Sequence, residues 1–150
     1  MSEDRAETRP LPVVPFMKVP DDEAPYLEGF ACRLCNAVFL GRRAACAKCG
    51  ARHQLDPKRL SNRGTLYTYS IVHRSFPGVA VPYVSAVVDL EGGGSIKGNL
   101  VGVDPDPRRI TFGMPIDVVY EEAPGRKDGD GNSYLAYFFR PHREYAGDPR

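Results

Sequence analysis

Two short stretches, Cys32-Arg33-Leu34-Cys35 and Cys46-Ala47-Lys48-Cys49, decide how the first part of this 150-residue chain folds. They contain its only four cysteines, as two Cys-x-x-Cys pairs separated by ten residues. Each pair can form a tight knuckle that directs two thiolates at one point, and two facing knuckles complete a tetrahedral sulfur site. The spacing therefore predicts a metal site whose ligands are Cys32, Cys35, Cys46 and Cys49.

The residues that follow the two pairs also favour knuckles. Gly50 comes directly after Cys49, and glycine readily adopts the left-handed backbone that such a turn needs. Asn36 follows Cys35, and asparagine is the next best residue for that conformation.

Zinc is the metal that we expect here, and iron is its competitor, because four thiolates also hold the single iron of rubredoxin-type sites. Disulfides are the alternative to a metal. The chain starts with Met-Ser-Glu-Asp-Arg and shows no apolar signal segment, so we expect a cytoplasmic protein with reduced cysteines. No stretch reaches the roughly twenty apolar residues of a membrane span. His53 is disfavoured as a ligand, since four cysteines already fill a tetrahedral site and leave no open position for catalysis.

Working outward from the cysteines, we divide the chain into three parts. Residues 1–28 form a proline-rich arm with a short helical turn near residues 21–27, and residues 29–60 form the zinc ribbon. The ribbon is too short to bury an adequate core, so metal binding is expected to supply most of its folding free energy. Residues 61–145 form the third part, a β domain.

The third part shows period-two alternation of β-branched and aromatic residues between glycine and proline breakers. It predicts five strands: Gly64–His73, Tyr83–Leu90, Ser95–Val101, Pro115–Glu121 and Ser133–Arg140. Gly92–Gly94 is interpreted as a hairpin turn and residues 124–132 as a polar loop. Gly98-Asn99 is interpreted as a β-bulge, with close approach of a ligand as the alternative. Five short strands with a break after the third favour a Greek-key OB barrel, although an open sandwich or SH3-like barrel gives a similar pattern. The expected fold is therefore mainly β: a rubredoxin-like zinc ribbon followed by a five-stranded OB-fold barrel.

Charge is nearly balanced over the chain, with 20 basic and 19 acidic residues, which gives no overall attraction to nucleic acid or anionic membrane. The basic residues are concentrated in one segment, however. Residues 41–63 contain seven basic groups and one acid, Asp56. Part of this excess balances the negative charge of a zinc tetrathiolate, and the other interpretation is a site for phosphates.

A second candidate surface follows the first predicted strand. The segment from Phe76 to Pro82 is unusually apolar for a surface connection, and exposed apolar patches tend to mark contact surfaces. His73 and Arg74 lie just before it, either as solvated groups at the sheet edge or as part of the same surface. The candidates for contact with a partner are His73, Arg74, Phe76, Val79, Val81 and Tyr83.

Five strings in this order resemble a known family: Tyr26-Leu27-Glu28-Gly29 before the first knuckle, Gly64-Thr-Leu-Tyr-Thr-Tyr-Ser-Ile-Val-His-Arg74, Pro82-Tyr-Val-Ser-Ala-Val-Val-Asp-Leu90, Gly98-Asn-Leu-Val-Gly102 and Gly113-Met-Pro-Ile-Asp-Val118. The chain resembles the acyl-CoA-associated OB-fold family with a rubredoxin-like zinc ribbon, formerly domain of unknown function thirty-five. The match runs from about Pro20 to Tyr137. Two departures are the proline-rich arm, which replaces a longer helical segment, and Asn36, where the family often has glycine.

The resemblance implies a non-catalytic accessory subunit. Its expected partner is a thiolase-like enzyme or a hydratase with a hot-dog fold, and its expected ligand is an acyl-CoA. On this interpretation the candidates for contact with the CoA phosphates are Arg42, Arg43, Lys48 and Arg52, and the partner-contact candidates from His73 to Tyr83 are also candidates for contact with the acyl chain.

Three other functions compete with this expectation. A catalytic role has little support, because the three histidines show no recognisable spacing to a serine, cysteine or aspartate partner. Single-stranded nucleic acid is the rival ligand, because OB barrels and zinc ribbons both bind it elsewhere, but the predicted barrel has no basic run to follow phosphates. A rubredoxin-like electron carrier would need iron.

Overall fold

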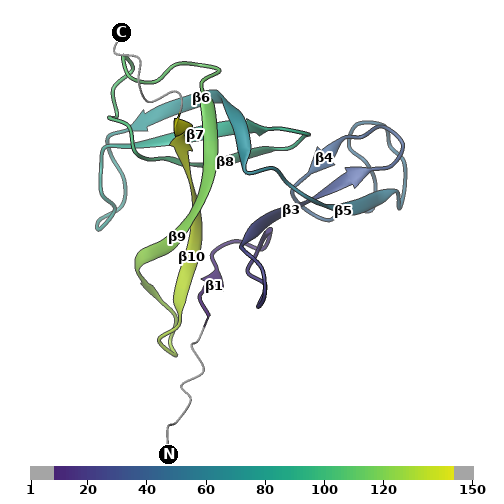
Figure 1. Ribbon diagram of the computed structural model, residues 1–150, viewed down its shortest axis with the longest axis horizontal. Coiled ribbons are helices and arrows are strands. Elements are labelled where there is room, and N and C mark those ends of the chain that lie inside the picture. Colours follow the sequence, from purple (N-terminus) through teal and green to yellow (C-terminus); the bar gives the residue numbers. More distant parts are fainter. Residues whose placement is uncertain (1–8, 144–150) are drawn as a thin grey trace, which may run out of the picture.

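The computed structural model describes residues 9–143, which form ten β-strands and no α-helix. In chain order they are β1 (Leu11–Pro12), β2 (Met17–Lys18), β3 (Tyr26–Cys32), β4 (Val38–Phe39), β5 (Leu55–Arg59), β6 (Arg63–Val72), β7 (Tyr83–Leu90), β8 (Ser95–Leu100), β9 (Pro115–Lys127) and β10 (Ser133–Pro141). Figure 1 shows β3, β4 and β5 to one side of a barrel made by β6 to β10. No helix within the described range is long and apolar enough to cross a membrane.

The five strands β6 to β10 form a closed barrel. They are hydrogen-bonded in the order β10-β8-β7-β6-β9, and an additional antiparallel pairing of β9 with β10 closes the ring. All neighbours are antiparallel except β8 and β10, which run parallel where Phe139 faces Leu100. This closed Greek-key order is that of an OB fold, and the expected fold class is confirmed.

The strands lie where the alternation predicts them, with one correction. β9 continues to Lys127, so the polar loop expected over residues 124–132 is shorter, and the β9–β10 hairpin extends beyond the barrel (Figure 1). Pro124 and Gly125 suggested that the strand ends before them. The strand instead continues through a shift in the β9–β10 register, where residues 123–126 lie opposite the single residue Tyr134. A bulge on a strand with a free edge accommodates both residue types.

The expected helical turn at residues 21–27 is wrong. Residues 21–23 form a bend, and β3 begins at Tyr26. Pro25 disfavours helical backbone in the residue before it, and Leu27 is instead fully buried as the strand partner of Met17. Further towards the N-terminus, β1 adds to the hairpin as a parallel neighbour of β10.

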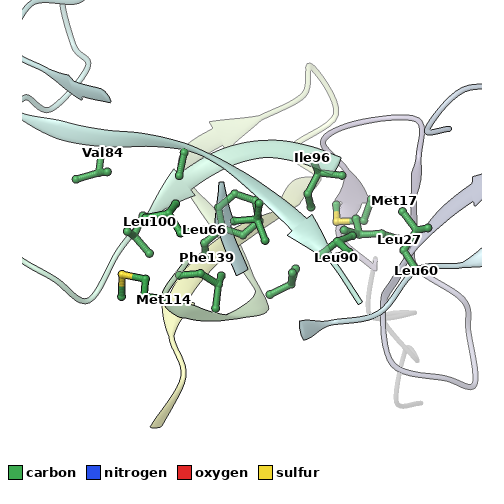
Figure 2. Packing of buried hydrophobic residues seen from close by; sticks show 14 of the residues in the cluster. Met17, Leu27, Leu60, Leu66, Val84, Leu90, Ile96, Leu100, Met114 and Phe139 are labelled. Atoms are coloured by element: carbon green, nitrogen blue, oxygen red, sulfur yellow. The ribbon is translucent and has the colours of Figure 1, made fainter. Parts of the chain in front are cut away.

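One hydrophobic core joins all three parts of the chain. Met17 from the arm, Leu27 from β3 and Leu60 after β5 pack in the same cluster as the barrel residues. Figure 2 shows these three side chains gathered beside Leu90, at the end of the barrel nearest the ribbon. The ribbon is therefore anchored to the barrel by apolar packing as well as by chain connectivity.

The glycine turn between β7 and β8 is a second anchor. Gly92–Gly94 form the expected hairpin turn, in which the Leu90 amide donates to the Gly94 carbonyl at 2.8 Å. Gly93 has φ 116° and lies so close to the ribbon that a Cβ atom would stand 2.6 Å from Val38. Lys58 of β5 donates to the Gly92 carbonyl at 2.6 Å. The turn thus needs glycine for its backbone and for contact with the ribbon.

Gly98, expected to form a bulge, lies in a regular stretch of β8. Its register with β7 is unbroken from Ser95 to Leu100, so the bulge prediction is wrong. A Cβ atom at this position would stand 2.9 Å from the ring of Tyr137 and 3.0 Å from that of Phe139. Glycine is used here to make room for two aromatic rings inside the barrel.

Candidate metal centre and its surroundings

The four cysteine sulfurs meet at one end of the ribbon. All four lie within 4.8 Å of one another, with Cys32 Sγ 3.8 Å from Cys49 Sγ and Cys35 Sγ 3.5 Å from Cys46 Sγ. Each of these two contacts joins one knuckle to the other. Both distances are far longer than the about 2.0 Å of a disulfide bond, and the cysteines are free thiols.

The two knuckles have matching hydrogen bonds. In the first, the Asn36 amide donates to the Cys32 carbonyl and the Cys32 amide to the Ala37 carbonyl, both at 2.9 Å. In the second, the Gly50 amide donates to the Cys46 carbonyl and the Cys46 amide to the Ala51 carbonyl, also at 2.9 Å. Asn36 and Gly50 occupy the same left-handed position, with φ 63° and 78°. The local sequence therefore folds each pair in the same way.

The left-handed backbone at Asn36 leads to a prediction. Asn36→Gly should change the free energy of unfolding by less than about 0.5 kcal/mol, because glycine accepts this φ without strain. Asn36→Val should cost about 1–2 kcal/mol, because a β-branched side chain clashes in this region. Thermal unfolding of the two metal-loaded variants checks this. Equal melting temperatures for the glycine and valine variants would show that the knuckle does not depend on this backbone angle.

The cage already favours negative charge at some of its sulfurs. The amides of Cys49 and Lys48 lie 3.5 and 3.4 Å from Cys46 Sγ, and they lower the pKa of that thiol to about 6. The amides of Cys35 and Leu34 lower the pKa of Cys32 in the same way. At Cys35 the Ala37 amide acts in that direction too, but burial and the other three thiols outweigh it and raise the pKa to about 11.

A divalent cation fits this site. Metal–sulfur bonds of about 2.3 Å in a tetrahedron place neighbouring sulfurs about 3.8 Å apart, close to the two distances found. Burial and mutual repulsion disfavour four thiolates at one site. A bound cation would offset both effects and stabilise the deprotonated sulfurs. The four cysteines can therefore hold a metal ion without any large movement of the chain.

The basic side chains on and beside the ribbon fall into two groups. Arg59 forms an ion pair with Glu23, Arg63 with Asp117, and the Lys58 ammonium donates to the Gly92 carbonyl. These contacts hold the arm, barrel and ribbon together. In contrast, four exposed side chains form no ion pair within residues 9–143: Arg42, Arg43, Lys48 and Arg52. They are the same four that the sequence suggests for phosphate contact.

Two of these arginines are held over aromatic rings. The Arg42 guanidinium lies 5.2 Å from the centre of the Phe30 ring, and that of Arg43 lies 4.5 Å from the centre of Phe39. A guanidinium stacked on a ring keeps its N–H edge free to bind an anion. The pairing of Phe30 and Phe39 across β3 and β4 explains this arrangement. Sequence reasoning missed these two rings, because nothing in their spacing marks them as arginine supports.

Two clefts adjoin this surface and share Arg42. The first, here called the arm–ribbon cleft, has a volume of about 400 Å³ and is bounded by residues of the arm and ribbon that include Phe16, Lys18, Glu28, Phe30, Leu40 and Arg42. The second, the ribbon cleft, has a volume of about 410 Å³ and is lined by Arg42, Arg43, Ala44, His53 and Leu55. Sequence reasoning missed the arm–ribbon cleft, because it exists only once the arm folds back against the ribbon.

The predicted contact loop after β6 is strongly exposed. The Phe76 side chain is 83% exposed, Val79 45% and Val81 42%, while His73 and Arg74 are exposed at the end of β6. Tyr83 is half-buried where β7 begins. A further exposed ring, Phe112, lies in the loop before β9 and packs on Tyr69 at 5.4 Å between ring centres. Exposed apolar side chains that gather in one loop tend to mark a contact surface.

The one histidine in the described range that contacts a carboxylate lies elsewhere. His142 Nδ1 is 2.9 Å from an Asp117 carboxylate oxygen, and Arg63 contacts the same imidazole at 3.0 Å. The His142 amide also donates to the Pro115 carbonyl. These contacts fasten the end of β10 to β6 and β9 where the barrel closes, so the cluster has a structural role.

Comparisons with known proteins agree with this architecture. A family model described as "ChsH2, C-terminal OB-fold domain" matches residues 58–121, from β5 into β9. A DUF35 domain-containing scaffold protein of Methanocaldococcus jannaschii is 35% identical over 119 residues, which are 77% of this chain and 81% of that protein. Benzoylsuccinyl-CoA thiolase subunit BbsA of Geobacter metallireducens is 29% identical over 127 residues, 83% of this chain and 82% of that subunit.

A solved structure gives the same result. A chain of the Ltp2-ChsH2(DUF35) aldolase superposes with a TM-score of 0.60 at 29% identity, covering 77% of this chain and 84% of that one. Fold and sequence agree over the ribbon and barrel together, and the resemblance noted from the five strings is confirmed. This chain belongs to the DUF35 family.

Proposed function

We propose that this chain is a non-catalytic subunit that docks on a thiolase-superfamily enzyme and helps to bind its acyl-CoA. The observation that carries the proposal is the similarity to a thiolase subunit, BbsA, over about four fifths of both chains. That similarity extends beyond the barrel into the ribbon, so it covers the parts that carry the cysteine cage and the unpaired arginines. Other relatives are scaffold proteins by name, which fits a role in assembly.

Zinc is the metal that we assign to the cage. Four thiolates in a closed tetrahedron are the ligand set of structural zinc sites, and such sites contribute directly to folding. On this assignment all four cysteines of the chain serve as ligands, so none remains as a nucleophile. The metal is then a structural element that holds the ribbon surface in place.

The four unpaired cations support binding of the CoA phosphates. Planar guanidinium groups bind phosphate oxygens in a bidentate manner, and Arg42 and Arg43 are already oriented by their aromatic supports. Lys48 and Arg52 add positive charge on the same ribbon. Within the described residues no carboxylate competes for any of the four.

Co-purification from the native host tests the proposal. A tagged chain should bring down a thiolase-superfamily enzyme in a fixed ratio, together with about one zinc per chain by elemental analysis. Recovery of nucleic acid with no acyl-CoA enzyme would overturn it.

The exposed loop after β6 is our candidate for the docking surface. Phe76→Ser should weaken binding to the co-purified enzyme by at least about tenfold, because a buried aromatic anchor is often worth 1–2 kcal/mol or more at an interface. The melting temperature of the free chain should not change, since the ring is 83% exposed. Surface plasmon resonance against the enzyme measures the affinity.

Leu34→Ser is the matched control, because Leu34 is also a large exposed apolar side chain, at 69%, but lies in the first knuckle. Equal loss of affinity in the two variants would show that the loop is not the specific docking surface. Unchanged binding of Phe76→Ser would exclude this ring as an anchor.

A further inference from the structure

The arm–ribbon cleft and the ribbon cleft offer two different chemistries that meet at Arg42. The arm–ribbon cleft presents the aromatic side chains Phe16 and Phe30 and the apolar Leu40, together with the charged groups of Lys18, Glu28 and Arg42. The ribbon cleft presents Arg42, Arg43 and His53. The arm–ribbon cleft therefore combines apolar and aromatic side chains with charged groups of both signs, whereas the ribbon cleft has no carboxylate among its lining residues.

The walls of the arm–ribbon cleft suit a flat ring. Phe30 is almost completely buried, and its ring supports the Arg42 guanidinium, which lies over it at 5.2 Å and is itself exposed, so the guanidinium plane is the surface that a ring can stack on. Phe16 is held in place by its contact with Tyr137, at 5.7 Å between ring centres. Rings and guanidinium planes of this kind stack on nucleobases. The volume of about 400 Å³ lies within the range of small-ligand sites.

The charged groups of this cleft form no ion pair within the part of the chain that the structure describes. Lys18, Glu28 and Arg42 line one cleft, yet none of them forms an ion pair with any residue between 9 and 143. A carboxylate repels phosphate but accepts a hydrogen bond from an exocyclic amine. Glu28 therefore favours the amino edge of a base at its own position in the cleft. The cations beside it, Arg42 above all, are placed to receive phosphates.

We propose that the arm–ribbon cleft binds the adenine ring of the acyl-CoA, with the phosphates of the adenosine directed across Arg42 to Arg43 in the ribbon cleft. This assignment rests on the proposed function, and it adds which part of the ligand each cleft receives. Glu28 is the specificity-determining residue for the base. Arg42 contacts both halves of the ligand, since it lines both clefts.

Calorimetric titration of the full zinc-loaded chain tests the assignment. Adenosine 3′,5′-bisphosphate should bind and should displace acetyl-CoA, whereas inorganic phosphate and adenosine should each bind much more weakly. Arg42→Met should weaken the bisphosphate by at least about tenfold, because it removes a charged contact. Arg108→Met, an exposed arginine in the loop between β8 and β9 and outside both clefts, is the matched control and should bind as the unmodified chain does.

The preference for one base over another gives a second readout, which would not change if Glu28 had only a structural role. The unmodified chain should prefer ADP to IDP, because the amine of adenine donates to Glu28 while the carbonyl of hypoxanthine cannot. Glu28→Gln can donate to that carbonyl, so the preference should fall by about fivefold or more while total phosphate affinity is kept. Zinc content and melting temperature confirm that each variant is folded.

The outcomes separate this assignment from the proposed function. Acetyl-CoA that binds but is not displaced by the bisphosphate, or an unchanged ADP preference in Glu28→Gln, would overturn the adenine site and leave the accessory role intact. Because both clefts lie within this chain, absence of binding by either ligand would overturn the site as well. The docking role is judged separately, by co-purification.

Discussion

Loss of the metal is expected to disorder the ribbon and leave the barrel folded but less stable. Structural zinc supplies about 10 kcal/mol or more to small modules of this kind, and few apolar side chains between Cys32 and Gln54 are buried deeply enough to replace it. The barrel has its own closed sheet and core. It should still lose stability, because Leu27 and Leu60 at the base of the ribbon pack in that core.

The double variant Cys46→Ser/Cys49→Ser, which removes one knuckle from the cage, tests this with hydrogen exchange. The amides of Cys32 and of residue 46, which bond to Ala37 and Ala51, should lose their protection. The Val101 amide, bonded to Phe139 between β8 and β10, should keep most of its protection. Ala47→Ser in the same knuckle keeps all four ligands and serves as the control. Parallel loss of protection in the ribbon and the barrel would show that the two unfold as one cooperative unit.

Gly64→Ala is expected to destabilise the barrel by about 3 kcal/mol and to lower its melting temperature by about 10 °C. A Cβ atom at Gly64 would stand 2.3 Å from the Asp89 carbonyl oxygen and 2.8 Å from Val88. Backbone cannot give way as a flexible side chain can, so the pairing of β6 with β7 must shift. Gly64 also pairs with Ile116 of β9, which carries the disturbance to the closure of the barrel.

The matched control is Gly41→Ala, where a Cβ atom would meet no other atom within 4 Å. Differential scanning calorimetry of both variants measures the effect. A melting temperature for Gly64→Ala within about 2 °C of the control would mean that the strand pair adjusts at little cost. In that case, close packing against β7 would not explain why glycine occupies position 64.

The sequence predicted the parts of the fold that depend on local pattern. Alternation along residues 64–140 located all five barrel strands, and the cysteine spacing predicted two knuckles that the structure brings face to face. What it missed depends on contacts distant in the chain. Gly98 looked like a bulge because the rings of Tyr137 and Phe139 come from another strand. The helical turn at residues 21–27 was excluded by the pairing of Leu27 with Met17.

The candidate site shows the same division. Arg42, Arg43, Lys48 and Arg52 could be selected from local charge density, and the structure shows that none of them is used in an ion pair within the described residues. Phe16, Lys18 and Glu28 could not be selected, because they line a common cleft with Arg42 only after the arm folds back along β3. Charge along a segment is visible in a sequence, whereas a cleft between segments is a product of packing.

The pairing of β1 with β10 determines when the chain can finish folding during its synthesis. The first strand of the described chain, with Leu11 opposite Tyr134, has the last strand as its sheet neighbour. On the ribosome, Leu11 and Pro12 must therefore wait without this partner until β10 has emerged. Contacts this distant in sequence form slowly, since loop closure must come first. Among the described strands, β1 is expected to be the last to gain protection from proteases.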